Sequence, residues 1–231
     1  MSVSNFYEKI PKEFLTKVDN PNYECHQIKI PARIIVSAPS GTGKTNFVCN
    51  FIQHFCKGKG TFADILVLTK DKSEPLYEWL ETKGINIQEG LHNLPDLNKF
   101  DKDVNHLIVI DDLMLAKNQD QVTEYFIRCR KKNVTIMYLC QHYFKCPLIV
   151  RQNSNYFVIL KAGNKKSLNM MLSDFSVGVD KDQLINMYEY ATKDKFNFLM
   201  ISCDENDPLK RYRHNFDKYH NPEDFNKKST C

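Results

Sequence analysis

The chain has 231 residues, of which 42% are hydrophobic and 26% are charged, and its formal net charge is +4. This length is sufficient for one well-buried α/β core, the composition is ordinary for a soluble globular domain, and the charge is too small to indicate a nucleic-acid partner by itself. No apolar run approaches the ~18–20 residues of a membrane span, and the first residues lack the basic-then-apolar pattern of a secretory signal, so we expect a cytosol-like compartment.

Apolar runs rich in β-branched residues alternate with helical stretches along the chain. This alternation predicts an α/β fold with a mostly parallel sheet that is covered by helices on both faces. The predicted strands occupy residues 33–37, 65–69, 107–110, 135–139, 156–160 and 198–202. The predicted helices occupy residues 44–55, 75–82, 119–130, 165–174 and 180–191.

The two ends of the chain differ from this alternating pattern. Residues 1–30 are predicted to be a peripheral lead-in, in which residues 26–30 form a strand beside the sheet. Residues 31–203 are predicted to form the core. From residue 204 the sequence is polar, basic and rich in Asn, Asp and Lys, so residues 204–231 are predicted to be an extended or partly disordered tail.

The first predicted strand leads into a sequence that matches a Walker A loop, with Ala38 at the usual first glycine. Glycine at positions 41 and 43 lets backbone N–H groups turn inward around a β-phosphate. Lys44 supplies a positive charge to the β- and γ-phosphates, and Thr45 offers a hydroxyl to Mg²⁺ at the start of a helix. The predicted ATP-binding residues are Pro39, Ser40, Gly41, Thr42, Gly43, Lys44, Thr45 and Asn46.

Two carboxylates follow the apolar run at residues 107–110, at the end of a strand where α/β sheets bind ligands. Asp111 is predicted to hold Mg²⁺ together with Thr45, and Asp112 to polarise the water that attacks the γ-phosphate. The next predicted strand ends at Gln141. In P-loop ATPases with a strand inserted between the two Walker motifs, a polar residue there senses the γ-phosphate, although a solvent-facing glutamine at a strand end is an equally good interpretation.

The eight cysteines include no C-x-x-C pair. The nearest approach to a metal-ligand cluster is Cys140, His142 and Cys146. A buried strand cysteine with loop neighbours explains this group better than a zinc site, so we expect reduced thiols.

Several segments beyond the Walker motifs resemble the poxvirus-type genome-packaging ATPases of the FtsK–HerA superfamily. The similar segments are Asp111-Asp112, the run from Arg128 to Val134, Gln141-His142-Tyr143-Phe144 with Pro147, and Arg151-Gln152-Asn153. The similarity covers residues 28–160. Three positions depart from the family pattern: Cys129 replaces a glycine, Lys131 stands where histidine is common, and Ala38 replaces the first loop glycine.

This resemblance implies an additional-strand, RecA-type P-loop core and a homo-oligomeric ring of about five or six subunits. Such a ring would hydrolyse ATP with Mg²⁺ and pump double-stranded DNA, without regard to its sequence, into a preformed capsid through a capsid or vertex protein. It would act in the virion or the host cytoplasm. The resemblance also implies an arginine that acts on a neighbouring subunit, with Arg130 as the first candidate and Arg151 as the second. Lys165 and Lys166, or the basic tail, are candidates for DNA contact.

Three other functions remain open from the sequence. A mobile-element DNA translocase or helicase would be expected to carry added domains. A small-molecule kinase or nucleotide switch would be expected to show an arginine-rich lid and no Asp111-Asp112 pair. A non-catalytic nucleotide-binding scaffold fits least well, because Lys44, Thr45 and both aspartates are intact.

Overall fold

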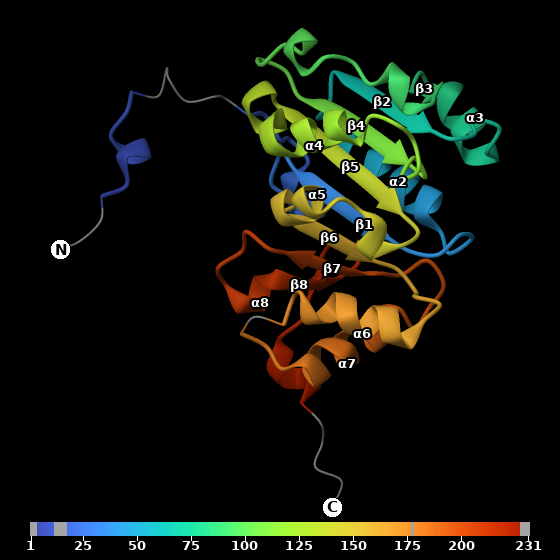
Figure 1. Ribbon diagram of the computed structural model, residues 1–231. Helices are drawn as coiled ribbons and strands as arrows, with labels where there is room; N and C mark the ends of the chain where they lie inside the picture. The colour runs from blue at the N-terminus through green and yellow to red at the C-terminus, as the bar shows by residue number, and fades with distance from the viewer. Residues whose placement is uncertain (1–3, 12–17, 177, 227–231) are drawn as a thin grey trace, which may run out of the picture.

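The computed structural model describes residues 4–11, 18–176 and 178–226. Within these residues one nine-stranded sheet has the order β3-β2-β4-β5-β1-β6-β7-β8-β9 (Figure 1). The strands are β1 Arg33–Ser37, β2 Asp64–Thr69, β3 Asn86–Glu89, β4 His106–Asp111, β5 Val134–Cys140, β6 Tyr156–Ile159, β7 Leu199–Ser202, β8 Tyr212–His214 and β9 Lys218–Tyr219.

The first six strands in this order pair in parallel, and β7, β8 and β9 continue the sheet in antiparallel pairs. The predicted α/β fold with a mostly parallel sheet is therefore confirmed. Strand β5 pairs with both β1 and β4. The strand before the Walker A loop and the strand that ends in Asp111 are thus separated by one inserted strand, which is the additional-strand arrangement that the family resemblance implies.

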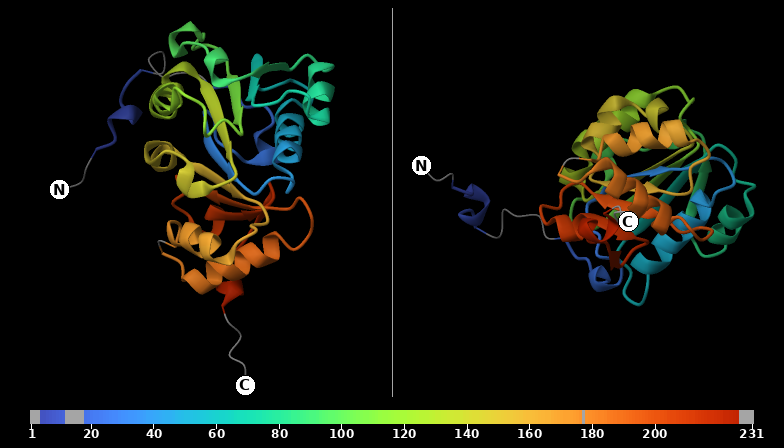
Figure 2. Two further views of the ribbon diagram at one scale, coloured as in Figure 1. Left: turned by 45° about the vertical axis from the view of Figure 1, so that its right-hand side comes forward. Right: turned by 90° about the horizontal axis from the view of Figure 1, so that it is seen from below.

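Helices cover both faces of the sheet, as Figure 2 shows. Helices α2 and α3 pack on one face, where their apolar side chains join one hydrophobic core, and α4, α5, α6 and α7 pack on the other face in a second core. The helices are α1 Tyr23–His26, α2 Lys44–Phe55, α3 Pro75–Glu81, α4 Gln119–Arg128, α5 Leu148–Asn153, α6 Lys165–Ser173, α7 Lys181–Ala191 and α8 Pro208–Arg211.

The sequence explains why α2 and β4 form as they do. Phe47, Phe51 and Phe55 recur at every fourth position of α2, and all three are buried against the sheet. Full burial of one such side chain contributes ~1.5–3 kcal/mol. Strand β4 is buried on both faces along its whole length, which requires the continuous apolar run at residues 107–110.

The predicted strand at residues 26–30 is wrong. His26 ends the short helix α1, and the residues after it bond to side chains instead of to a neighbouring strand. The backbone N–H of Ile28 donates to Nδ1 of His26 at 3.0 Å, and that of Lys29 donates to the Tyr156 hydroxyl at 2.9 Å. These local partners satisfy the backbone N–H groups without pairing to a neighbouring strand.

The prediction of an extended or disordered tail from residue 204 is also wrong over residues 204–226, since β8 pairs with β7. Arg213 in β8 is almost completely buried, and its guanidinium donates to the carbonyl oxygens of His26, Gln27 and Phe216. The polar composition hid this strand because its arginine bonds to backbone carbonyls inside the protein. Residues 227–231 lie outside the described residues.

No helix in the described ranges is long and apolar enough to cross a membrane. The seven cysteines within those ranges are free thiols, and burial raises the pKa of Cys140 to about 12, which keeps this thiol neutral.

Candidate nucleotide-binding site

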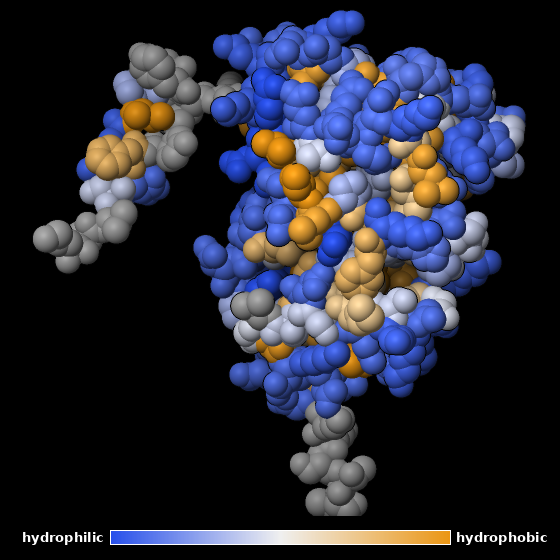
Figure 3. Space-filling model, viewed as in Figure 1, coloured by the Kyte–Doolittle hydropathy of each residue, from blue (hydrophilic) through white to orange (hydrophobic). Residues whose placement is uncertain are grey.

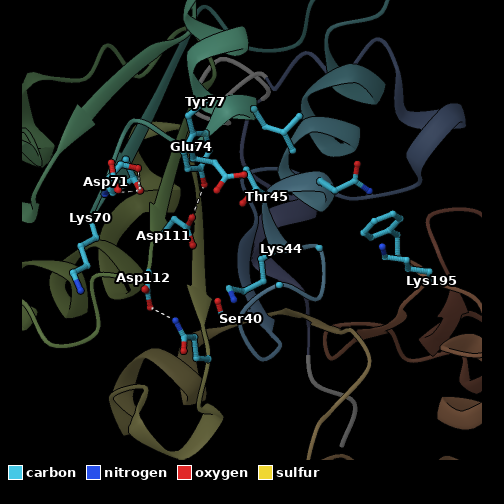
Figure 4. A pocket seen from close by; sticks show the side chains of 17 residues that line it. Ser40, Lys44, Thr45, Lys70, Asp71, Glu74, Tyr77, Asp111, Asp112 and Lys195 are labelled. Atoms are coloured by element: carbon cyan, nitrogen blue, oxygen red, sulfur yellow. Dashed lines mark hydrogen bonds between the residues drawn. The ribbon is translucent and has the colours of Figure 1, made fainter.

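The Walker A loop and the strand-end aspartates line one pocket of about 440 Å³ at the carboxyl ends of the parallel strands (Figure 4). The sheet order produces this convergence, because β1, β5 and β4 are neighbours and each ends at the same edge of the sheet. The lining residues are Ser40, Gly41, Gly43, Lys44, Thr45, Asn46, Thr69, Lys70, Asp71, Glu74, Leu76, Tyr77, Asp111, Asp112, Gln141, Lys195 and Phe196.

The loop between β1 and α2 has the backbone geometry that its glycines allow. Gly41 has φ 73° and Gly43 has φ 105°, values in the left-handed region that favours glycine. The side chain of Lys44 is buried, and its Nζ donates to the carbonyl oxygens of Ala38 and Pro39 at 3.1 Å each. Both acceptors belong to the loop itself, so the ammonium group is held inside the curve where phosphates are expected to bind.

Asp111 ends β4 and is buried beside Tyr77 from α3. The Tyr77 hydroxyl donates to Oδ2 of Asp111 at 2.6 Å, whereas Oδ1 is buried and has no hydrogen-bond partner among the described residues. Burial raises the pKa of the Asp111 carboxyl group above its ordinary value, although the Tyr77 hydroxyl and the Lys44 charge both act to lower it. The orphaned oxygen is suited to a cation.

These groups fit a magnesium ion. Thr45 faces Asp111 across the pocket (Figure 4), and the Tyr77 hydroxyl interacts with both. A carboxylate oxygen and a threonine hydroxyl are hard oxygen ligands of the kind that Mg²⁺ prefers when it is also bound to substrate phosphates. Tyr77 would then keep the Asp111 carboxylate in one orientation.

Asp112 follows β4 and Gln141 follows the neighbouring strand β5, so the two side chains lie side by side. The Gln141 side-chain amide donates to Oδ1 of Asp112 at 2.9 Å. Asp112 has φ 53°, so the chain turns sharply directly after β4, and its carboxylate lies beside Gln141. The structure therefore brings Lys44, Thr45, Asp111, Asp112 and Gln141 to one pocket, while the role of each remains a prediction.

Sequence reasoning missed eight of the lining residues, namely Thr69, Lys70, Asp71, Glu74, Leu76, Tyr77, Lys195 and Phe196. Glu74 and Tyr77 come from the start of α3, and Glu74 is within electrostatic range of Asp111. Lys195 and Phe196 come from the loop before β7, and Figure 4 shows Lys195 on the far side of the Walker A loop from Asp111. The one available signal was Pro75, which predicted the start of α3 and hence the turn that carries Glu74.

The two candidate arginines lie outside this pocket. Arg130 is exposed in the 3₁₀ turn Cys129–Lys132, which precedes the amino end of β5. Arg151 in α5 is mostly buried: its Nε donates to the Cys146 carbonyl at 3.3 Å, and its guanidinium lies 3.6 Å from Asp174 and 5.0 Å from the centre of the Tyr143 ring. Arg151 is therefore engaged within its own chain.

Replacing Asp111 with asparagine is expected to stabilise the nucleotide-free protein by a few degrees while destroying Mg²⁺-dependent nucleotide binding. The folded-state pKa of Asp111 is raised above its unfolded value, so its ionisation opposes folding. This destabilisation is absent below the unfolded pKa and is complete above the folded pKa. The gain in melting temperature of Asp111→Asn should thus be larger at neutral pH than at the lowest pH at which the protein stays folded. Equal gains at both pH values would show that ionisation of Asp111 does not oppose folding.

Comparison with known proteins places the chain in a family. The family model described as "Poxvirus A32 protein" matches residues 73–205, a segment that includes both aspartates and Gln141 but not the Walker A loop. A comparison with curated protein sequences gave no match.

Solved structures with a similar fold include a viral packaging NTPase and a conjugation coupling protein. The genome packaging NTPase B204 of Sulfolobus turreted icosahedral virus 2 in complex with AMPPCP aligns with a TM-score of 0.57 at 11% identity, covering 76% of this chain and 94% of that one. Its complex with ATP-gammaS gives 0.52 at 12% identity with the same coverage. The pCW3 conjugation coupling protein TcpA gives 0.54 at 13%, covering 86% of this chain and 65% of that one.

These identities are low, so the structural likeness shows the fold alone: a P-loop ATPase core of the type seen in the packaging NTPase. The family match is of a different kind, since it rests on sequence and spans more than half of the 231 residues. This chain belongs to the Poxvirus A32 protein family.

Proposed function

We propose that this protein hydrolyses ATP with Mg²⁺ and uses the energy to move double-stranded DNA into a viral capsid. The observation that carries the proposal is the convergence of Lys44, Thr45, Asp111 and Asp112 in one pocket. Membership of the A32 family supports a viral role, and the similar B204 protein is itself described as a genome packaging NTPase. We place the activity in the virion or the infected-cell cytoplasm.

Each residue has a part in the proposed chemistry. Lys44 binds the β- and γ-phosphates, and Thr45 and Asp111 would hold Mg²⁺, which supplies charge neutralisation at the phosphates when it is bound. Asp112 orients and polarises the attacking water. The hydrogen bond from Gln141 at 2.9 Å fixes the Asp112 carboxylate and links it to the end of β5. Gln141 therefore senses whether the γ-phosphate is present and transmits this to β5.

Arg130 is suited to act on a neighbouring subunit and not on its own. Strand β5 separates Arg130 from Gln141, and its seven residues span ~20 Å, which is longer than an arginine side chain. The guanidinium has no ion-pair partner within the described ranges. We therefore propose that the amino edge of one sheet meets the carboxyl edge of the next, a head-to-tail contact that closes into a ring of about five or six copies.

An apolar surface beside Arg130 fits this contact with a second copy of the chain. Figure 3 shows hydrophobic residues gathered over α4 and α5. Ile127 is 52% exposed, Leu148 56% and Ile149 46%, and α4 leads directly into the turn that carries Arg130. Exposed large aliphatic side chains on α4 and α5, together with the exposed arginine that follows α4, are typical of an interface, where they lose contact with water on assembly. Arg151 is the weaker candidate because Asp174 and Tyr143 already engage it.

Double-stranded DNA is expected to stimulate ATP hydrolysis without regard to base sequence, and the stimulation should fall steeply as salt rises. Both results follow from binding to the phosphate backbone, which releases condensed counterions. The measurement is phosphate release with long duplexes of different composition over a series of salt concentrations. A preference for one short sequence that persists at high salt would contradict a translocating motor and indicate a regulatory DNA-binding protein.

The same assay tests the proposed DNA contact at the start of α6, where Lys165 and Lys166 are both exposed. Replacing both with alanine should reduce the slope of log affinity against log salt by roughly one for each lost phosphate contact. The matched control removes the same charge at Lys99 and Lys102, which are also exposed but lie before β4 at the other edge of the sheet. An equal reduction in both double variants would place the DNA path elsewhere.

A further inference from the structure

A second hollow of about 320 Å³ adjoins the proposed phosphate pocket, and neither Walker motif accounts for it. It lies between α2 and the segments on either side of β7 and β8. Asn46 and Phe196 line both hollows, so the two are neighbours across these two residues. A molecule with its phosphates at the Walker A loop would reach the second hollow by passing Phe196.

Phe196 is an unusual residue to find beside a Walker A loop. Its side chain is 44% exposed, and its backbone has φ 70°. A left-handed backbone is rare for a bulky residue and carries strain, which the fold tolerates more often at ligand sites than elsewhere. The ring also lies so close to Gly43 that a Cβ at position 43 would be 2.5 Å from Cδ1 of Phe196.

The walls of the second hollow combine a rigid apolar floor with polar side chains. Phe47, Phe198 and Phe216 pack against one another, with Phe198 perpendicular to both of the others. Apart from Phe196, the other lining residues are Cys25, Asn46, Asn50, His54, Asn197, Asn215 and Asp217, so four side-chain amides reach the hollow. The Asn215 amide donates to Oδ1 of Asn197 and the Asn50 amide donates to the Asn46 carbonyl, which fixes their orientation. An apolar surface with a few convergent amide groups is the usual chemistry of a site for a flat heterocycle, because amides both donate and accept hydrogen bonds.

The charged side chains around the Walker A loop indicate which way a bound nucleotide points. Asp111 and Asp112 stand on one side of the Walker A loop, where the metal and the attacking water are expected, and Lys195 stands on the other (Figure 4). The terminal phosphate must point to the aspartates, so the nucleoside must leave the loop toward Lys195 and Phe196. The Nζ of Lys195 lies 4.8 Å from the centre of the Phe196 ring, on a flexible stem that can move aside.

We propose that the base of the bound nucleotide occupies this second hollow and that Phe196 is the residue on which it stacks. The proposal rests on the proposed binding of ATP at the Walker A loop, and it adds the part of the site that recognises the nucleoside. Stacking on Phe196 also couples the base to the loop, because the same ring packs on Gly43.

The test compares ATP with inorganic tripolyphosphate, which has the phosphates but no base. Titrations of the purified full chain in the presence of Mg²⁺ should show that Phe196→Ala weakens ATP binding by roughly 5- to 150-fold, the range for loss of one base–aromatic stack. Binding of tripolyphosphate should change less than about twofold. Phe196→Tyr keeps the ring and should restore ATP affinity. Phe6→Ala removes an aromatic side chain that is 71% exposed and lines neither hollow, and serves as the control.

The outcomes separate this inference from the proposed function. If the unaltered protein binds neither ATP nor tripolyphosphate, the nucleotide site itself is wrong, and the inference fails with it. If the unaltered protein binds both and Phe196→Ala loses both equally, the ring supports the Walker A loop and not the base, and the inference is overturned alone. Unchanged ATP affinity in Phe196→Ala overturns it as well.

Discussion

Replacing Lys44 with alanine is expected to abolish ATP hydrolysis and to weaken ATP binding. The ammonium group is held within the curve of the Walker A loop by the carbonyl oxygens of Ala38 and Pro39, where it meets the β- and γ-phosphates. Loss of one preorganised electrostatic group in such a site costs at least roughly 10²-fold in turnover. Lys195 also lines the pocket, but it is exposed at the far side of the loop and cannot substitute for a buried charge.

The measurement is steady-state phosphate release together with a direct binding titration. Lys83→Ala, an exposed lysine just beyond α3, is the control for loss of a positive charge. Asp112→Asn makes an informative contrast, since it should still bind Mg-ATP through Lys44, Thr45 and Asp111 but hydrolyse it slowly, because an amide cannot take up a proton. Normal turnover in Lys44→Ala would show that the Walker A loop is not the catalytic site.

The central part of the fold could be predicted because its physics is local. A strand buried on both faces needs a continuous apolar run, and the runs at β1, β4 and β5 are long enough to be unambiguous. The edge strand β3 has the sequence Asn-Ile-Gln-Glu, in which one residue is buried, so it carries no such signal. The six-residue helix α5 is shorter than the span over which helical periodicity becomes visible.

The same division holds for the candidate site. Lys44, Thr45 and the two aspartates were predicted because each stands within a short motif next to a recognisable strand. Tyr77 and Phe196 could not be predicted, since their place in the pocket depends on how α3 and the loop before β7 pack against the sheet. A tyrosine whose hydroxyl bonds to Asp111 looks in the sequence like any apolar residue of a helix. Local patterns thus identified the chemical groups, and tertiary packing supplied those that position them.

Arg130→Ala is expected to lower turnover by roughly 10³- to 10⁵-fold while leaving nucleotide affinity nearly unchanged, if the arginine acts on a neighbouring subunit's γ-phosphate. The variant keeps Lys44, Thr45, Asp111 and Asp112, so its own pocket can still bind ATP. Arg128→Ala is the matched control, because Arg128 is exposed two positions earlier and is already paired with Glu124 in its own helix.

Mixing Arg130→Ala with Lys44→Ala protein then separates a ring motor from an ATPase that works alone. The Lys44→Ala subunit has a dead pocket but still carries Arg130, and it can lend this arginine to the intact pocket of an Arg130→Ala neighbour. Some activity should return in the mixture, and it should depend on total protein concentration because assembly does. A structural or cis-acting Arg130 gives no rescue at any ratio. Because β5 is ~20 Å long, Arg130 cannot reach the nucleotide pocket of its own subunit. Rescue can therefore come only through an interface that joins the amino edge of one sheet to the carboxyl edge of the next.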